Sequence, residues 1–169
     1  MRLTHLADEL GISDRTARRA AALGLIRGAR SAPRDFLVFR GEAEYLRENW
    51  AWLEPARRAV RRLPGVSFAA VWRAAAASQT RDPDRIDLVV ASAVPQLGPL
   101  QIRLSRALSR PVTITPLPWV LDQPAAIVEL VDHGRVLVDL ADHWRRLKRA
   151  RPAARMRIGP PKPPETRWP

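Results

Sequence analysis

The sequence predicts a mixed α+β protein in which a helical segment with a short hairpin precedes a small α/β domain. In the first 63 residues, apolar side chains recur at helical spacing and glycines interrupt them. After residue 64, short β-rich runs alternate with helical segments, which is the order of an α/β domain. We therefore expect three regions, at residues 1–63, 64–144 and 145–169.

Two helices joined by a tight turn are predicted at the start of the chain. Apolar residues at helical spacing define the first helix: Leu3, Leu6, Ala7 and Leu10. Thr4 is its N-cap candidate, and Gly11 ends it. Ser13 is placed to cap a second helix that runs to Leu23, and Gly24 can end that helix in a left-handed conformation.

A wing and a third helix are predicted to follow. Residues 25–27 and 36–39 are typical of short strands around a polar loop at 28–35. A helix begins near Gly41 and either continues through Pro55 or resumes after it. One face of this helix carries four apolar residues: Tyr45, Leu46, Trp50 and Leu53. Together these elements predict a winged helix-turn-helix.

The stretch LTHLADELGISDRTARRAAALGLI resembles the opening of winged helix-turn-helix regulators of the mercury-resistance and excisionase type. The resemblance implies that the second helix enters the major groove of DNA and that the wing contacts the flanking backbone. The candidate DNA-binding residues are Ser13, Arg15, Thr16, Arg18, Arg19, Arg27, Arg30 and Arg34. The alternatives are a solvated helix face or a helix-turn-helix that binds only proteins.

The middle region has the pattern of an α/β domain. Strands are predicted at residues 68–72, 86–91, 112–115 and 136–139, and helices at 97–108 and at 119–131 with an interruption near Pro124. The stretches DRIDLVVA, SRPVTI and IVELVDHGRVLVD resemble, in order and spacing, the minimal nucleotidyltransferase fold related to polymerase beta. A small α/β domain with a chance similarity is the alternative.

The resemblance places five residues at the positions of the family's active site. Asp87 matches the second acid, but Arg85 stands at the first acid and Thr113 at the third. Arg73 and Ala74 occupy the Gly-Ser positions that approach the phosphates. Nucleotidyl transfer needs convergent carboxylates for two Mg²⁺ ions. We therefore expect a degenerate domain with no catalytic residues, no metal and no cofactor, unless a loop shift brings Asp84 into the site.

The charge of the chain is uneven. Residues 1–63 carry 13 arginines against 8 acidic residues, residues 64–140 carry 7 of each sign, and residues 141–169 carry 9 basic and 2 acidic residues. Basic ends around a neutral middle favour a polyanionic partner. Residues 145–169 are expected to form a basic, Pro-rich tail: residues 141–149 can finish a helix, and the stretch from Ala150 onward is expected to be flexible.

These patterns lead to one main functional hypothesis and two alternatives. We expect a cytoplasmic, nucleoid-associated bacterial transcriptional regulator that is not an enzyme, binds double-stranded DNA and forms a homodimer. Its second domain would serve in dimerisation, sensing or binding of a protein partner, with no membrane involved. The first alternative is an active, antitoxin-like minimal nucleotidyltransferase that its winged helix targets or autoregulates. The second is an architectural or phage or plasmid accessory protein.

Overall fold

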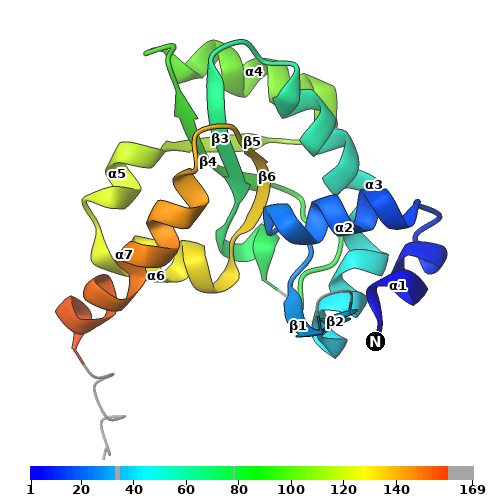
Figure 1. Ribbon diagram of the computed structural model, residues 1–169. Helices are drawn as coiled ribbons and strands as arrows, with labels where there is room; N and C mark the ends of the chain where they lie inside the picture. Colours follow the sequence, from blue (N-terminus) through cyan, green and yellow to red (C-terminus); the bar gives the residue numbers. More distant parts are fainter. Residues whose placement is uncertain (33–34, 78, 160–169) are drawn as a thin grey trace, which may run out of the picture.

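The computed structural model describes residues 1–32, 35–77 and 79–159 and confirms the mixed α+β class (Figure 1). The helices are α1 (Leu3–Glu9), α2 (Asp14–Leu23), α3 (Arg40–Arg61), η1 (Arg73–Ala76, a 3₁₀ helix), α4 (Leu97–Leu108), α5 (Leu117–Leu121), α6 (Pro124–His133) and α7 (His143–Ile158). The strands are β1 (Gly28–Ala32), β2 (Asp35–Val38), β3 (Val66–Val71), β4 (Ile86–Ser92), β5 (Val112–Pro116) and β6 (Arg135–Asp139).

Helices α1 and α2 form where the sequence predicts them, and the cap of α2 is the predicted one. The Ser13 hydroxyl accepts a hydrogen bond from the Thr16 amide at 3.3 Å, and Gly24 ends the helix at φ 98°. The prediction for α1 is wrong at its start. Thr4 lies inside the helix, and the N-cap is Arg2, whose backbone forms a β-bridge to Leu37.

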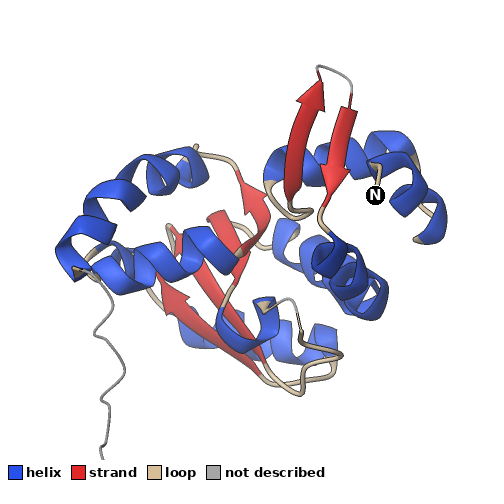
Figure 2. Cartoon of the chain, turned by 90° about the horizontal axis from the view of Figure 1, so that it is seen from below, coloured by secondary structure: helices blue, strands red, loops and turns tan. Residues whose placement is uncertain are grey.

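The first strand of the hairpin lies later in the chain than the sequence predicts, whereas the second lies close to its predicted place. Leu25 and Ile26 were expected in a strand, but both are fully buried and their amides donate to the Ala20 carbonyl at the end of α2. The first strand instead begins at Gly28 and pairs antiparallel with β2. A Cβ at Gly28 would collide with the backbone of Leu37, so this close pairing requires glycine. Figure 2 shows the hairpin projecting away from the larger sheet.

Helix α3 continues through Pro55 to Arg61, which decides between the two predicted courses. Three of the residues predicted on the buried face of this helix are buried: Tyr45, Leu46 and Leu53. The fourth prediction, Trp50, is wrong, because the buried tryptophan of this helix is Trp52. Trp52 is buried, and Trp50 is only half-buried. The reason is that α3 packs against both α4 and the larger sheet, so it buries more of its circumference than a single apolar stripe.

The larger sheet has four strands in the order β5-β4-β3-β6, with β3 antiparallel to both neighbours and β4 parallel to β5. Alternate residues of β3 face opposite layers. Ala69 and Val71 pack toward α3 and α4, whereas Phe68 and Ala70 pack toward α5, α6 and α7 (Figure 1). The first of these layers is one buried cluster with the cores of α1 and α2, so packing is continuous across residue 64.

The end of the described chain is more helical than expected. We expected a helix no further than Arg149 and a flexible stretch after it, but α7 extends to Ile158 because Leu147 and Ala154 are buried against the layer of α5 and α6. Residues 160–169 lie outside the described part. None of the helices in the described ranges combines the length and the apolar character that crossing a membrane requires.

Candidate functional site

All five residues at the predicted nucleotidyltransferase positions lie at one end of the larger sheet. Asp87 on β4 pairs in register with Thr113 on β5. On its other side, the Asp87 carbonyl accepts a hydrogen bond from the Trp72 amide at 3.0 Å. Arg73 and Ala74 follow Trp72 directly and begin η1. The strand pairing therefore assembles these residues as the sequence layout predicts.

Asp87 is the buried acid of this site. Its side chain is 5% exposed, and Arg85, two residues earlier on the same face of the strand, places its Nε 3.4 Å from the Asp87 Oδ1. The Arg85 side chain is 62% exposed, so it covers the carboxylate while its charge remains open to solvent. Thr113 is also exposed. The predicted surface pairing of Arg85 with Asp87 is present.

Arg73 adds a second cation at the same end of the sheet. It has a left-handed backbone (φ 54°), and its guanidinium lies over the Trp72 ring at 4.4 Å from the centroid. It borders a cavity of about 320 Å³. The other residues that line this cavity are Ala74, Ala77, Gln79, Glu129 and His133. Glu129 and His133 on α6 give it a polar wall that the sequence did not indicate.

The residues present do not fit a two-magnesium centre. Within the described residues, no three His, Asp or Glu side chains come together as a metal-binding group. Asp82 is held by Arg110 at 2.8 Å, and Asp84 is exposed. The charged group in contact with Asp87 is Arg85, at a position where the resemblance implies a further carboxylate.

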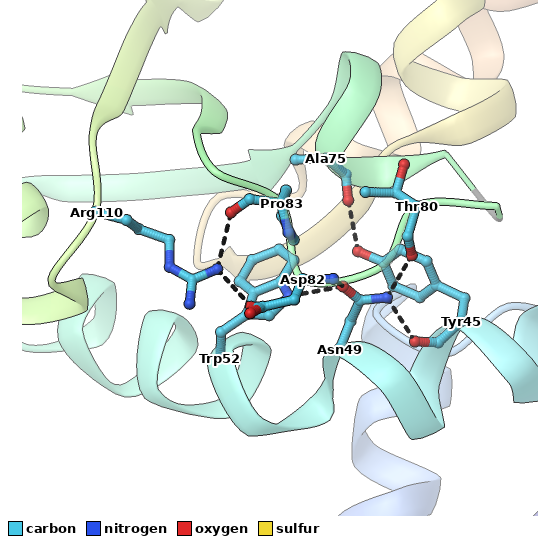
Figure 3. A network of polar contacts seen from close by, with 8 residues as sticks. All are labelled: Tyr45, Asn49, Trp52, Ala75, Thr80, Asp82, Pro83 and Arg110. Atoms are coloured by element: carbon cyan, nitrogen blue, oxygen red, sulfur yellow. Dashed lines mark hydrogen bonds and ion pairs between the residues drawn. The ribbon is translucent and has the colours of Figure 1, made fainter.

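A polar network on α3 holds the loop between η1 and β4 (Figure 3). Tyr45 donates through its hydroxyl to the Ala75 carbonyl at 2.6 Å. Asn49 is fully buried: its amide nitrogen donates to the Thr80 carbonyl at 2.7 Å, and its amide oxygen accepts from the Asp82 amide at 3.1 Å. Helix α3 therefore fixes both ends of the loop that leads from Arg73 to Asp87.

A buried ion pair joins α3 to β6 beside this network. Arg135 and Glu42 are 0% and 4% exposed and form a hydrogen-bonded salt bridge. The Arg135 guanidinium also lies over the Tyr45 ring, 3.5 Å from the centroid, and donates to the Ala76 carbonyl. Burial raises the pKa of the Tyr45 hydroxyl, which keeps it a neutral donor.

Sequence reasoning missed Glu42, Asn49 and Arg135. Glu42 and Asn49 lie on one helix, but Arg135 is far from both in the chain, and no spacing rule links it to them. The one available signal was an acid and an amide among the apolar residues of the third predicted helix.

The predicted DNA-binding residues divide into two groups. Arg15, Arg18 and Arg19 are exposed on α2, and Arg30 is exposed on β1. Ser13 and Thr16 hydrogen-bond each other at the start of α2. Arg34 lies outside the described residues.

Arg27 forms the second group, because it is bound to residues of α6 and α3. Its side chain donates to the Asp132 carbonyl, and its amide donates to Glu42 at 3.1 Å. Burial, together with the charge of Arg135, lowers the pKa of Arg27. Arg27 thus joins the N-terminal segment to α6 instead of lining the hairpin.

No family model matches the chain, and no curated protein matches it in sequence. Among solved structures, it is similar to a chain of the toxin–antitoxin MntA–HepT, with 13% identity and a TM-score of 0.46 over 64% of this chain and 88% of that one. A toxin–antitoxin structure with AMP-PNP gives 13% identity and a TM-score of 0.47 over 63% and 88%. The tri-AMPylated Shewanella oneidensis HEPN toxin in complex with the MNT antitoxin gives 16% identity and a TM-score of 0.41 over 65% and 94%.

These comparisons contradict one prediction from the sequence. We expected a chain that is not an enzyme, whereas the similar structures are of toxin–antitoxin systems in which one contains AMP-PNP and another a tri-AMPylated toxin. The expectation of a non-enzyme is therefore corrected.

Proposed function

We propose that the chain is a minimal nucleotidyltransferase of the antitoxin type that modifies a partner protein and carries its own DNA-binding segment. The observation that carries the proposal is the placement of Asp87: a buried carboxylate near the start of β4, paired with Arg85 and hydrogen-bonded through its backbone to Trp72, which directly precedes Arg73. The cavity of about 320 Å³ beside Arg73 supplies room for a small ligand.

In the proposed reaction, arginine side chains neutralise the negative charge of the ATP phosphates. A hydroxyl oxygen of the acceptor attacks the α-phosphorus of ATP, and a new phosphorus–oxygen bond forms. The bond to the bridging oxygen breaks, and pyrophosphate leaves with that electron pair. Arg73 and Arg85 are the side chains that offset the negative charge of the phosphates. Asp87 is the group that accepts the proton of the attacking hydroxyl.

The N-terminal segment supplies the second half of the proposal. Two helices with a tight turn, followed by an antiparallel hairpin, expose arginines on α2 and β1. We propose that this winged helix-turn-helix binds double-stranded DNA, which would let the protein regulate its own expression. A homodimer on symmetric half-sites belongs to the same proposal.

A transfer assay tests the enzymatic part. The purified chain is incubated with α-labelled Mg²⁺·ATP and a HEPN toxin as acceptor, and label on the acceptor is measured. Asp87→Asn should lower transfer by about two orders of magnitude or more. Asp84→Asn is the matched control, because this exposed carboxylate lies three residues earlier in the chain, and it should transfer like the wild type. Circular dichroism checks that both variants fold. Equal transfer by both variants would refute the role of Asp87.

A further inference from the structure

The surface beside α2 contains two basic hollows. The first, about 130 Å³, lies between α2 and the hairpin and is bordered by Arg18, Arg30 and Asp35. The second, about 120 Å³, lies between α2 and the C-terminal half of α3 and is bordered by Arg19, Arg57 and Arg61. The second hollow is lined by both α2 and α3, which the sequence predicts as separate helices without a contact between them.

The two hollows lie on opposite flanks of α2. In the first, the α2 residues are Arg18, Ala21 and Ala22. In the second, they are Thr16, Arg19, Ala20 and Leu23. At 3.6 residues per turn, these two rows are on nearly opposite sides of the helix. Arg15 lies between Arg18 and Arg19 on the outer face, since Ala17 and Ala20 form the buried one.

The charge in the second hollow is largely unneutralised. Glu54 is its one acid, and it is held by Arg57 at 2.7 Å and by Arg58 at 2.9 Å. Arg19 and Arg61 are exposed and have no ion-pair partner among the described residues. The half-buried Trp50 also lines this hollow. Such a hollow suits a phosphate group, which two arginines can approach from opposite walls.

We infer that α3 forms a second backbone-binding wall for DNA, in which Arg61 together with Arg19 binds phosphates of one strand while the hairpin side binds the other. A helix in the major groove has a phosphate backbone on each side of it, because the groove is about 12 Å wide and just admits a helix. Basic hollows on both flanks of α2 match that arrangement. This inference rests on the proposed binding of double-stranded DNA.

The salt dependence of binding tests it. Affinity of the full chain for short random-sequence duplexes is measured by fluorescence anisotropy across a NaCl series. Each phosphate contact adds about one unit to the slope of log K against log salt, so Arg61→Gln should lower the slope by about one. The double variant Arg19→Gln with Arg61→Gln should lower it by about two.

A matched control separates local contacts from loss of net charge. Arg106→Gln removes the same charge from an exposed position on α4, outside both hollows, and should keep the wild-type slope. If the wild type binds and Arg61→Gln keeps its slope, the second wall is refuted while DNA binding stands. If the wild type does not bind duplexes even at low salt, the DNA-binding proposal itself fails.

Discussion

At the scale of single residues, the Glu42–Arg135 pair is the contact with the greatest consequence for stability. It is buried, it joins α3 to β6, and Glu42 also accepts the Arg27 amide. A buried charge that loses its partner is strongly unfavourable, because the remaining ion keeps its desolvation cost. This one carboxylate therefore affects both the N-terminal segment and the sheet.

We expect Glu42→Ala to destabilise the protein by about 3–5 kcal/mol, because it leaves Arg135 buried without a counter-ion. Urea unfolding measures the change. Glu44→Ala is the control: that glutamate pairs with Arg40 on the surface, where a pair contributes about 0.5 kcal/mol or less. Equal losses for the two variants would contradict the importance of the buried pair.

The sequence could predict these residues only in part. Local signals were sufficient for Ser13 and Gly24, because a helix cap depends on neighbouring residues. They were also sufficient to place Asp87 in a strand, of which it is the second residue. They could not pair Glu42 with Arg135, because that contact depends on tertiary packing. The local pattern also predicted that Trp50, and not Trp52, lies on the buried face, because a single apolar stripe does not describe a helix that is buried on several sides.

At the scale of elements, the end of α2 packs closely against β6 and α7. Gly24 ends α2 at φ 98°, and its carbonyl accepts a hydrogen bond from the Val136 amide at 3.3 Å. A Cβ at Gly24 would lie 2.8 Å from the Trp144 Nε1 on α7. The end of α2 is thus fixed by its own conformation and by a helix much later in the chain.

We expect Gly24→Ala to cost more than 1 kcal/mol, because it combines a left-handed backbone with a collision against Trp144. Gly11→Ala is the matched control: Gly11 is also left-handed, at φ 64°, but its Cβ would meet open space. Melting temperatures of the two variants give the comparison. A larger loss at Gly11 would mean that Trp144 does not restrict this position.

At the scale of the whole molecule, the N-terminal segment and the larger sheet share one core. The buried cluster that contains Leu6 and Leu25 also contains Val71 and Leu88. The polar network of Asn49 and the buried pair of Glu42 cross the same boundary. Helix α3 packs against both the N-terminal helices and the larger sheet. A domain boundary at residue 64 therefore does not separate two independent cores.

A shared core should make unfolding cooperative. We expect a single transition in urea, with tryptophan fluorescence and far-ultraviolet circular dichroism giving the same midpoint. Both parts contain tryptophans, so either one unfolding alone would be detected. Two separated transitions would show that the parts unfold independently and that the contacts across α3 contribute little.

The course of α3 has a geometric consequence. Because one continuous helix from Arg40 to Arg61 borders the α2 hollow and also holds the loop before Asp87, this helix sets how the two sites are oriented relative to each other. On a bound duplex, the end of the sheet would then point toward one side of the double helix. Inserting half a helical turn between two half-sites would rotate that side away and leave the contacts of each half-site unchanged.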